Sequence, residues 1–221
     1  MFTTRFQAWV RRNALRLARL LARLPITPNQ VTAIGMTLTF VAAVLAGFGR
    51  LLPAGLVLAF AGTFDILDGA LARASKRSYP YGAFFDSTID RYSEGAVYLG
   101  VAAYFLGRPG PWMRLEVLAC LVALAGSFLV SYVRARAQSL GFTCDSGLFA
   151  RPERVVLTVL GLIVGGLGFP IVLGVVVGLL AVVTNLTALQ RIHEVWKQAR
   201  AQRRAREAAA AAPARGETSR P

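Results

Sequence analysis

Aspartates gather in one part of this chain, although acidic residues are scarce in it. The sequence has 221 residues and eleven acidic side chains, and four of its five aspartates are Asp65, Asp68, Asp86 and Asp90. The first two are three residues apart and the last two are four apart, so each pair lies on one face of a helix. Carboxylates gathered in this way repel one another unless cations lie between them. Oxygen ligands without His or Cys favour Mg²⁺ or Mn²⁺ over zinc, so the pattern predicts a site for two divalent cations.

The aspartates lie in a strongly apolar chain, of which 55% of the residues are hydrophobic and 16% are charged. This composition excludes an ordinary soluble domain. Ionisable residues inside membrane helices are costly and are functional candidates for that reason. Two other readings stay open. The aspartates could form the transit site of a divalent-cation transporter, although such sites tend to lie at the middle of the membrane. They could also form salt bridges with nearby basic residues, which are Arg73, Lys76, Arg77 and Arg91.

Six apolar stretches are long enough, or nearly so, to cross the ~30 Å hydrocarbon layer as helices. We therefore expect an all-α membrane protein with six transmembrane helices, preceded by an N-terminal amphipathic interfacial helix. Asn29 is expected to cap the first crossing. Residues 73–82 then form the turn of a hairpin that brings the two aspartate pairs opposite each other. The expected crossings are residues 30–48, 52–72, 83–106, 112–133, 155–167 and 170–189.

Three regions follow from this pattern. Residues 1–24 alternate arginines with apolar residues at helical spacing, which is typical of a helix that lies in the headgroup plane or packs on a partner. Residues 25–200 form the six-helix domain. Residues 201–221 form a basic tail, expected to begin as a fraying helix and to end in disorder.

Basic residues are distributed unevenly among the connections. The net charge is +14, and in so apolar a chain this favours a lipid surface over nucleic acid as the partner. With Arg91 set aside inside a crossing, 21 Lys and Arg residues fall on the side of the two termini and 3 on the other side. Cytoplasmic loops carry such an excess. We therefore expect a multi-pass protein of the cell membrane, with both termini and the aspartates facing the cytoplasm.

The segment FDILDGALARASKRSYPYGAFFDSTID, residues 64–90, resembles the signature of the CDP-alcohol phosphatidyltransferases. That signature sets four aspartates, two glycines and an Ala-Arg pair at fixed spacings. The resemblance implies a six-helix, usually homodimeric membrane enzyme whose polar cavity faces the cytoplasm, and it extends from the N-terminal helix to the last crossing. Every element of the signature is present, at Asp65, Asp68, Gly69, Ala72, Arg73, Gly82, Asp86 and Asp90.

The resemblance also implies a reaction. The family transfers a substituted phosphoryl group from a CDP-linked donor, usually CDP-diacylglycerol, to an alcohol and releases CMP. Asp65, Asp68 and Asp86 would then hold the two cations, and Asp90 would both ligate metal and accept the proton of the incoming hydroxyl. Small residues leave room for the nucleotide, and a guanidinium suits the pyrophosphate. The residues expected to bind the donor are Asn29, Thr32, Asp68, Gly69, Ala72, Arg73 and Gly82.

A second polar cluster indicates the acceptor. Arg134 ends the fourth crossing, and Arg151 and Arg154 precede the fifth. This surplus of guanidinium groups beside a metal site favours a second phosphate, and so a phosphorylated acceptor. The segment resembles phosphatidylinositol-phosphate synthases and their archaeal counterparts, which implies inositol phosphate as the acceptor. Glycerol 3-phosphate, used to make phosphatidylglycerol phosphate, is the alternative. The phosphate pocket is expected at Ser131, Arg134, Arg151 and Arg154.

Overall fold

The computed structural model describes residues 27–74, 80–144 and 151–211. Within these ranges the ordered elements are all helices, which confirms the all-α expectation for the described residues. The predicted interfacial helix of residues 1–24 lies outside them. The six helices are α2 (Pro28–Gly47), α3 (Leu51–Ala74), α4 (Pro80–Leu106), α5 (Met113–Ser139), α6 (Arg151–Gly166) and α7 (Pro170–Ala211).

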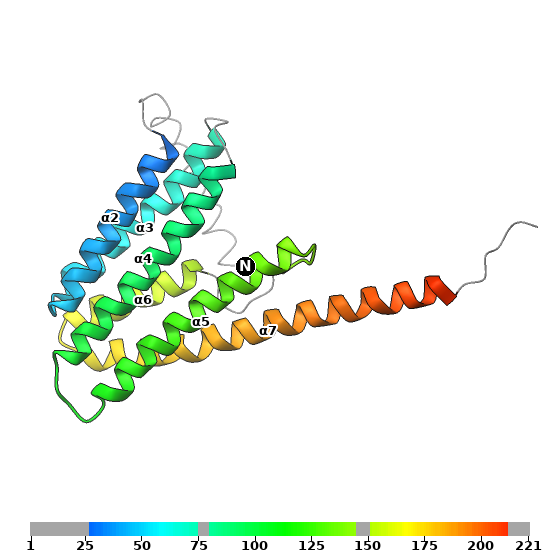
Figure 1. The fold of residues 1–221 in the computed structure, drawn as a ribbon. Helices are drawn as coiled ribbons and strands as arrows, with labels where there is room; N and C mark the ends of the chain where they lie inside the picture. The colour runs from blue at the N-terminus through cyan, green and yellow to red at the C-terminus, as the bar shows by residue number, and fades with distance from the viewer. Residues whose placement is uncertain (1–26, 75–79, 145–150, 212–221) are drawn as a thin grey trace, which may run out of the picture.

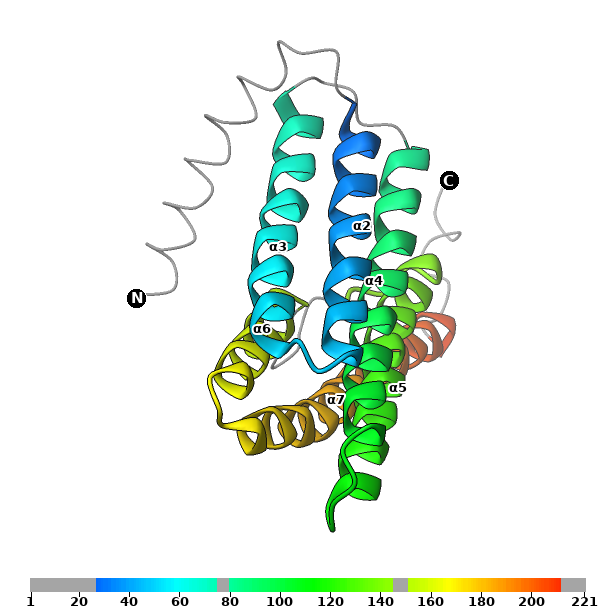
Figure 2. The ribbon, with the colours of Figure 1, turned by 90° about the vertical axis from the view of Figure 1, so that its left-hand side faces the viewer.

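The described helices pack in a closed ring. Helix α2 packs against α3 and α4, and Figure 2 shows it between them. The ring continues from α3 to α6, from α6 to α7, from α7 to α5 and from α5 back to α4 (Figure 1). Helices α4 and α6 are not packed neighbours among the described elements. They face each other across the ring, which leaves room for a pocket between them.

The start of α2 differs from the sequence expectation. Thr27, rather than Asn29, is the N-cap: its Oγ1 accepts a hydrogen bond from the backbone N–H of Gln30, whose side-chain oxygen accepts one from the Thr27 N–H. This reciprocal pair is a capping box. Pro28 occupies the first helical position, where its missing N–H costs no hydrogen bond. Asn29 therefore lies inside the first turn and is not required as a cap.

Close backbone approach holds parts of the ring together. A methyl group placed on Gly100 of α4 would overlap the carbonyl oxygen of Ala43 in α2. One placed on Gly126 of α5 would overlap the Thr184 hydroxyl in α7. The turn between α2 and α3 contains Gly49, whose φ of +75° is a conformation that other residues adopt at a cost. Glycine at these positions therefore sets how near neighbouring helices can lie.

Three of the described helices are long and apolar enough to cross a membrane, judged by length and composition: Asn29–Gly47, Met113–Ser139 and Pro170–Ala208. A shorter apolar stretch covers Leu51–Asp65 of α3. Helix α4 carries Asp86, Asp90, Arg91 and Glu94, and α6 has only 16 residues, which is why these two fall short of that criterion. Large apolar side chains are exposed on every described helix, as expected of surfaces that face lipid.

Helix α7 is longer than the crossing expected within it. The sequence predicts a crossing over residues 170–189 and a separate tail from residue 201, but the helix runs without a break to Ala211. Figure 1 shows its last turns extending beyond the other helices. The helical start of the tail is therefore continuous with the bundle. Its remainder, residues 212–221, lies outside the described residues.

We predict that Gly100→Ala will destabilise the protein, because the added methyl group meets the Ala43 backbone, which cannot rotate away. Overpacking of this kind costs about 1–3 kcal/mol. Thermal unfolding in detergent should show the loss as a lower midpoint. The control is Gly178→Ala in α7, where no described heavy atom lies within 4 Å of the added methyl group. An equal midpoint for the two variants would contradict the proposed close contact.

Candidate active site

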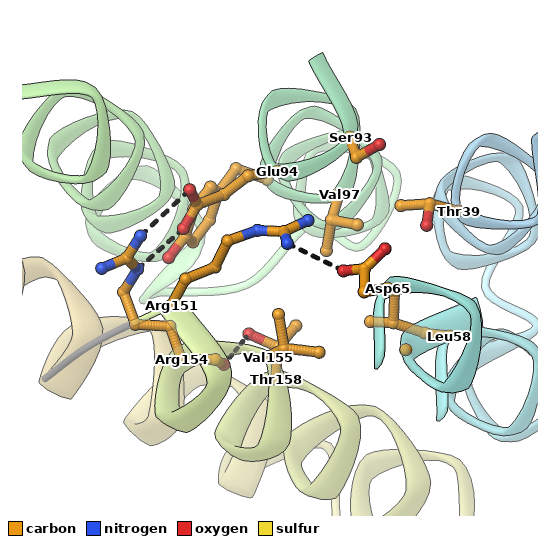
Figure 3. A pocket seen from close by; sticks show the side chains of 12 residues that line it. Thr39, Leu58, Asp65, Ser93, Glu94, Val97, Arg151, Arg154, Val155 and Thr158 are labelled. Carbon is orange, nitrogen blue, oxygen red and sulfur yellow. Dashed lines mark hydrogen bonds and ion pairs between the residues drawn. The ribbon is translucent and has the colours of Figure 1, made fainter. Parts of the chain in front are cut away.

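A pocket lined by both apolar and polar side chains opens inside the ring, between α3, α4 and α6 (Figure 3). Aliphatic side chains such as Leu58, Val97 and Val155 form part of its wall. Hydroxyl groups lie among them, and charged side chains reach into the pocket from three helices. The polar lining residues are Thr39, Asp65, Ser93, Glu94, Tyr98, Arg151, Arg154 and Thr158. A few polar groups therefore converge in a concave site whose wall is otherwise apolar.

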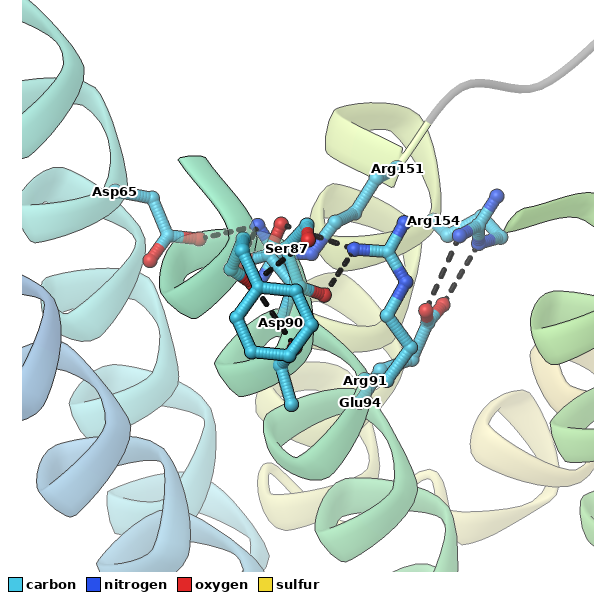
Figure 4. Close-up of polar contacts among 9 residues, drawn as sticks. Asp65, Ser87, Asp90, Arg91, Glu94, Arg151 and Arg154 are labelled. Atoms are coloured by element: carbon cyan, nitrogen blue, oxygen red, sulfur yellow. Dashed lines mark hydrogen bonds and ion pairs between the residues drawn. The ribbon is translucent and has the colours of Figure 1, made fainter. Parts of the chain in front are cut away.

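Arg151 joins two of the predicted metal ligands. Its Nη1 lies 2.8 Å from Asp65 Oδ2 on α3 and 2.8 Å from Asp90 Oδ1 on α4 (Figure 4). Arg151 is the first residue of α6, so the start of that helix places its guanidinium between the two carboxylates. Burial lowers the pKa of Arg151, but Asp65 and Asp90 outweigh burial and raise that pKa above its usual value. The guanidinium is therefore permanently charged.

Asp86 lies one turn before Asp90 on α4 and is an electrostatic neighbour of Asp65 and Arg151. Three of the four predicted aspartates thus face one region, and the fourth, Asp68, has a side chain outside the described set. No three described acidic side chains close on one point as metal ligands. Arg151 occupies the space between two of them.

The alternative that the aspartates form salt bridges with nearby basic residues is confirmed only in part. Arg91 Nη1 lies 3.7 Å from Asp90 Oδ2, and the same side chain donates to the carbonyl of Ser87. The strong contacts come instead from Arg151, a residue far away in sequence. The Arg73 side chain, Lys76 and Arg77 lie outside the described residues.

Glu94 and Arg154 form a second, deeper ion pair. Arg154 Nε lies 2.8 Å from Glu94 Oε1, and its Nη2 lies 3.1 Å from Oε2, so the pair is bidentate. Only 3% of the Arg154 side chain and 9% of the Glu94 side chain are exposed. Sequence analysis missed Glu94, although it follows Asp90 by four residues and so shares its helix face.

A further arginine, Arg191, lies near both Arg134 and Arg154. Arg191 of α7 is buried and donates from Nη1 to the Val130 carbonyl of α5 at 2.7 Å, and Arg134 and Arg154 are its electrostatic neighbours. The sequence expectation included Arg134 and Arg154 but counted Arg191 only as a loop charge. Ser131, the remaining predicted phosphate ligand, is half-buried on α5 between Val130 and Arg134. Positive charge from α5, α6 and α7 thus gathers beside the negative charge of α3 and α4.

The predicted donor residues meet at the starts of α2 and α4. A methyl group built on Gly82 would lie 3.5 Å from Asn29 Oδ1, so these two positions face each other. Thr32, one turn after Asn29, is buried. The remaining predicted donor residues, Asp68, Gly69, Ala72 and Arg73, belong to the last part of α3, where the side chains are not described.

This arrangement can bind an anion on the arginine side and a cation on the aspartate side. Asp90, 16% exposed, lies 2.8 Å from Arg151, which lines the pocket, and a carboxylate in this place can take a proton from a bound group. No His, Cys or Ser nucleophile with an adjacent base is present among the side chains that line the pocket. Direct transfer between two bound substrates therefore fits the site better than a covalent enzyme intermediate.

Comparison with known proteins identifies the family of this chain. Residues 25–195 match the CDP-alcohol phosphatidyltransferase family. Phosphatidylinositol phosphate synthase of Mycobacterium marinum is 40% identical over 184 residues, which are 81% of this chain and 78% of the relative.

Two crystal structures of phosphatidylinositol phosphate synthase from Mycobacterium tuberculosis are similar in fold. The one with CDP-DAG bound has a TM-score of 0.76 at 37% identity and covers 84% of this chain and 94% of its own. The one in complex with manganese and citrate has a TM-score of 0.75 at 37% identity, over 83% and 88% of the two chains. From its signature, its pocket and these matches, this chain belongs to the CDP-alcohol phosphatidyltransferase family.

Proposed function

We propose that this enzyme transfers a phosphatidyl group from CDP-diacylglycerol to inositol phosphate and releases CMP. The observation that carries the proposal is one pocket lined by both Asp65 and the buried Arg154. Carboxylates on one side suit a cation-bound diphosphate, and arginines on the other suit a second phosphate. The names of the similar proteins, phosphatidylinositol phosphate synthases, support the same acceptor.

The reaction forms one bond and breaks one. The acceptor hydroxyl oxygen bonds to the phosphorus that carries diacylglycerol, and the bond between that phosphorus and the CMP oxygen breaks. The departing oxygen keeps the electron pair, so CMP leaves as an anion. Asp90 accepts the proton of the hydroxyl, a role that needs a carboxylate within hydrogen-bond reach of the acceptor.

The aspartates suit divalent cations. Oxygens of Asp65 and Asp90 already converge on a single cationic nitrogen, and this donor set of carboxylate oxygens is the kind that Mg²⁺ and Mn²⁺ prefer. We assign Asp65, Asp68, Asp86 and Asp90 as the residues that would hold two such ions. When bound, the ions neutralise the diphosphate and stabilise the attacking and leaving oxygens. The manganese complex of the M. tuberculosis relative supports this assignment.

The acceptor phosphate is assigned to the arginine side of the pocket. Arg134 and Arg154 are the central residues, and Ser131 adds a hydroxyl. Arg191 extends the same positive region from α7. Arg151 also fits this role, because its Nε is a buried side-chain nitrogen without a hydrogen-bond partner among the described residues. An unpaired buried donor is costly, and a phosphate oxygen would satisfy it.

The CDP moiety is assigned to the opposite side, where the starts of α2 and α4 meet. Asn29 and Thr32 would contact it from α2, and Gly82 leaves space for it at α4. The family signature adds four further residues that would bind the CDP moiety, which are Asp68, Gly69, Ala72 and Arg73.

The protein is a membrane protein with several apolar helices. We propose six crossings, with the pocket and both termini in the cytoplasm and residues 1–24 on the membrane surface. From the resemblance to the family we also propose that the enzyme is a homodimer. The transporter reading has little support, because Asp86 and Asp90 both lie in the first half of α4, before its midpoint.

The acceptor is tested by incubating purified protein with CDP-diacylglycerol, Mn²⁺ and one alcohol at a time. Inositol phosphate should give CMP and a lipid product with the mass of phosphatidylinositol phosphate. Unphosphorylated inositol should react far more slowly, because it lacks the group that the arginines bind. Product formation from glycerol 3-phosphate but not from inositol phosphate would overturn the proposed acceptor.

We predict that Asp90→Asn will lower turnover by about a hundredfold or more, because the amide cannot accept the hydroxyl proton. The variant should also lose much of the rise in unfolding temperature that Mn²⁺ gives the wild type. The matched control is Glu207→Gln, which removes a carboxylate paired with Arg203 on the exposed part of α7. Near-normal turnover in Asp90→Asn would refute the assigned role.

Arg134→Gln should raise the KM for inositol phosphate about tenfold while kcat changes little, because a lost charge-assisted hydrogen bond is worth about 1.5–3 kcal/mol. Steady-state kinetics with saturating CDP-diacylglycerol measures this. Arg136→Gln is the control, since both arginines are exposed on α5 but Arg136 bonds Ser139 on its own helix. The assignment fails if both variants keep the wild-type acceptor KM.

A further inference from the structure

The ion pair of Glu94 and Arg154 is the most buried of the ion pairs between described residues. Both oxygens of Glu94 accept from Arg154, which fixes the plane of the guanidinium as well as its position. Figure 3 shows the two side chains meeting across the pocket, one from α4 and the other from α6. Glu94 is not one of the residues of the family signature, and its contact with Arg154 indicates its role.

Stability alone is a weak reason for such a pair. Removing two charges from water costs about as much as their attraction returns, and well-packed apolar residues often replace a buried pair without loss. Helices α4 and α6 are held in place mainly by their packed neighbours in the ring. The pair therefore contributes something other than cohesion between helices, and a fixed orientation of Arg154 is what its geometry provides.

The position of Glu94 along α4 relates it to the reacting atoms. Glu94 follows Asp90 by four residues, and Arg154 follows Arg151 by three, so two ion pairs lie one above the other between α4 and α6. A helix rises about 6 Å over four residues. One rigid helix thus carries the proton acceptor and, one turn deeper, the carboxylate that holds the arginine.

We infer that Glu94 is a positioning residue, which holds Arg154 so that the phosphate of the acceptor binds one helical turn from Asp90. The inference rests on the proposed function. It explains how the site can favour an alcohol whose hydroxyl and phosphate are separated by a set distance. Tyr98 continues the same face of α4 one turn deeper, where its hydroxyl lies 3.4 Å from Ser127 Oγ.

The test is a double-mutant cycle of Glu94→Gln and Arg154→Gln. In Glu94→Gln, the KM for inositol phosphate should rise about tenfold, while the KM for CDP-diacylglycerol should stay within twofold and kcat within threefold. Glu153→Gln is the matched control, because it removes an exposed carboxylate next to Arg154. The control should leave all three constants unchanged.

The double-mutant cycle distinguishes a Glu94 that acts by positioning Arg154 from a Glu94 that acts independently of Arg154. If Glu94 acts through Arg154, then Glu94→Gln should add less than twofold to the acceptor KM of Arg154→Gln. If the two substitutions instead multiply in their effects on the acceptor KM, the inference is wrong. It is also wrong if Glu94→Gln raises the KM for inositol phosphate and the KM for CDP-diacylglycerol equally and lowers the unfolding temperature, because a merely structural role produces that result. Glu94→Gln alone could fail to fold, because it leaves the buried Arg154 charge unpaired. The double variant has no unpaired buried charge, so its acceptor KM can still be compared with that of Arg154→Gln, and this comparison decides whether Glu94 acts through Arg154.

The same data keep the inference apart from the proposed function. Wild-type protein and Glu153→Gln must first form product from inositol phosphate, and failure there counts against the function. If they do so and Glu94→Gln retains the wild-type acceptor KM, only the inference is lost.

Discussion

Carboxylates inside a ring of apolar helices must face positive charge, and this requirement explains how the pocket is built. Asp86, Asp90 and Glu94 follow one another on a single face of α4, and Asp65 approaches them from α3. Left alone, these groups would repel one another in a medium that screens charge poorly. Helix α6 supplies the compensation, because it begins at the pocket with Arg151 and Arg154 in its first turns. The short length of α6 fits this role.

The two ion pairs between α4 and α6 differ in a way that suits catalysis. The upper one is shared among three residues and is partly exposed, since 25% of the Arg151 side chain and 35% of the Asp65 side chain reach solvent. Charges in such a place can exchange partners when cations or phosphates enter. The lower pair, between Glu94 and Arg154, is closed off and bidentate. The site therefore combines a partly exposed, exchangeable charge cluster with a buried, fixed one.

The ring makes this pocket possible because α4 and α6 have other helices to pack against. Glycine allows α2 to lie directly on α4, and α5 on α7, so those contacts are tight without filling the centre. The exposed apolar side chains on the outside are then available to lipid. An apolar exterior and a charged interior are the reverse of a soluble protein, and both follow from the same chain.

Several features could be predicted from the sequence because they are local. The spacing of Asp86 and Asp90 places both on one face of their helix, whatever that helix packs against. The six helical regions follow from runs of apolar residues. The start of α2 was predicted two residues late, since the capping box at Thr27 outweighs the cap propensity of Asn29. A helical start of the tail was also predicted, and Ala and Arg propagate α7 past the end of the apolar run to Ala211.

The partners of the charged residues were decided by the tertiary structure alone. Sequence analysis placed Arg151 on the acceptor phosphate, and only the fold shows that its Nη1 also lies beside Asp65 and Asp90. It overlooked Glu94, whose importance lies in a contact with Arg154 sixty residues away. The period of a helix determines the direction of each side chain about its own axis. Which side chains meet across a pocket depends on the order and rotation in which separate helices pack, and no local pattern carries that information.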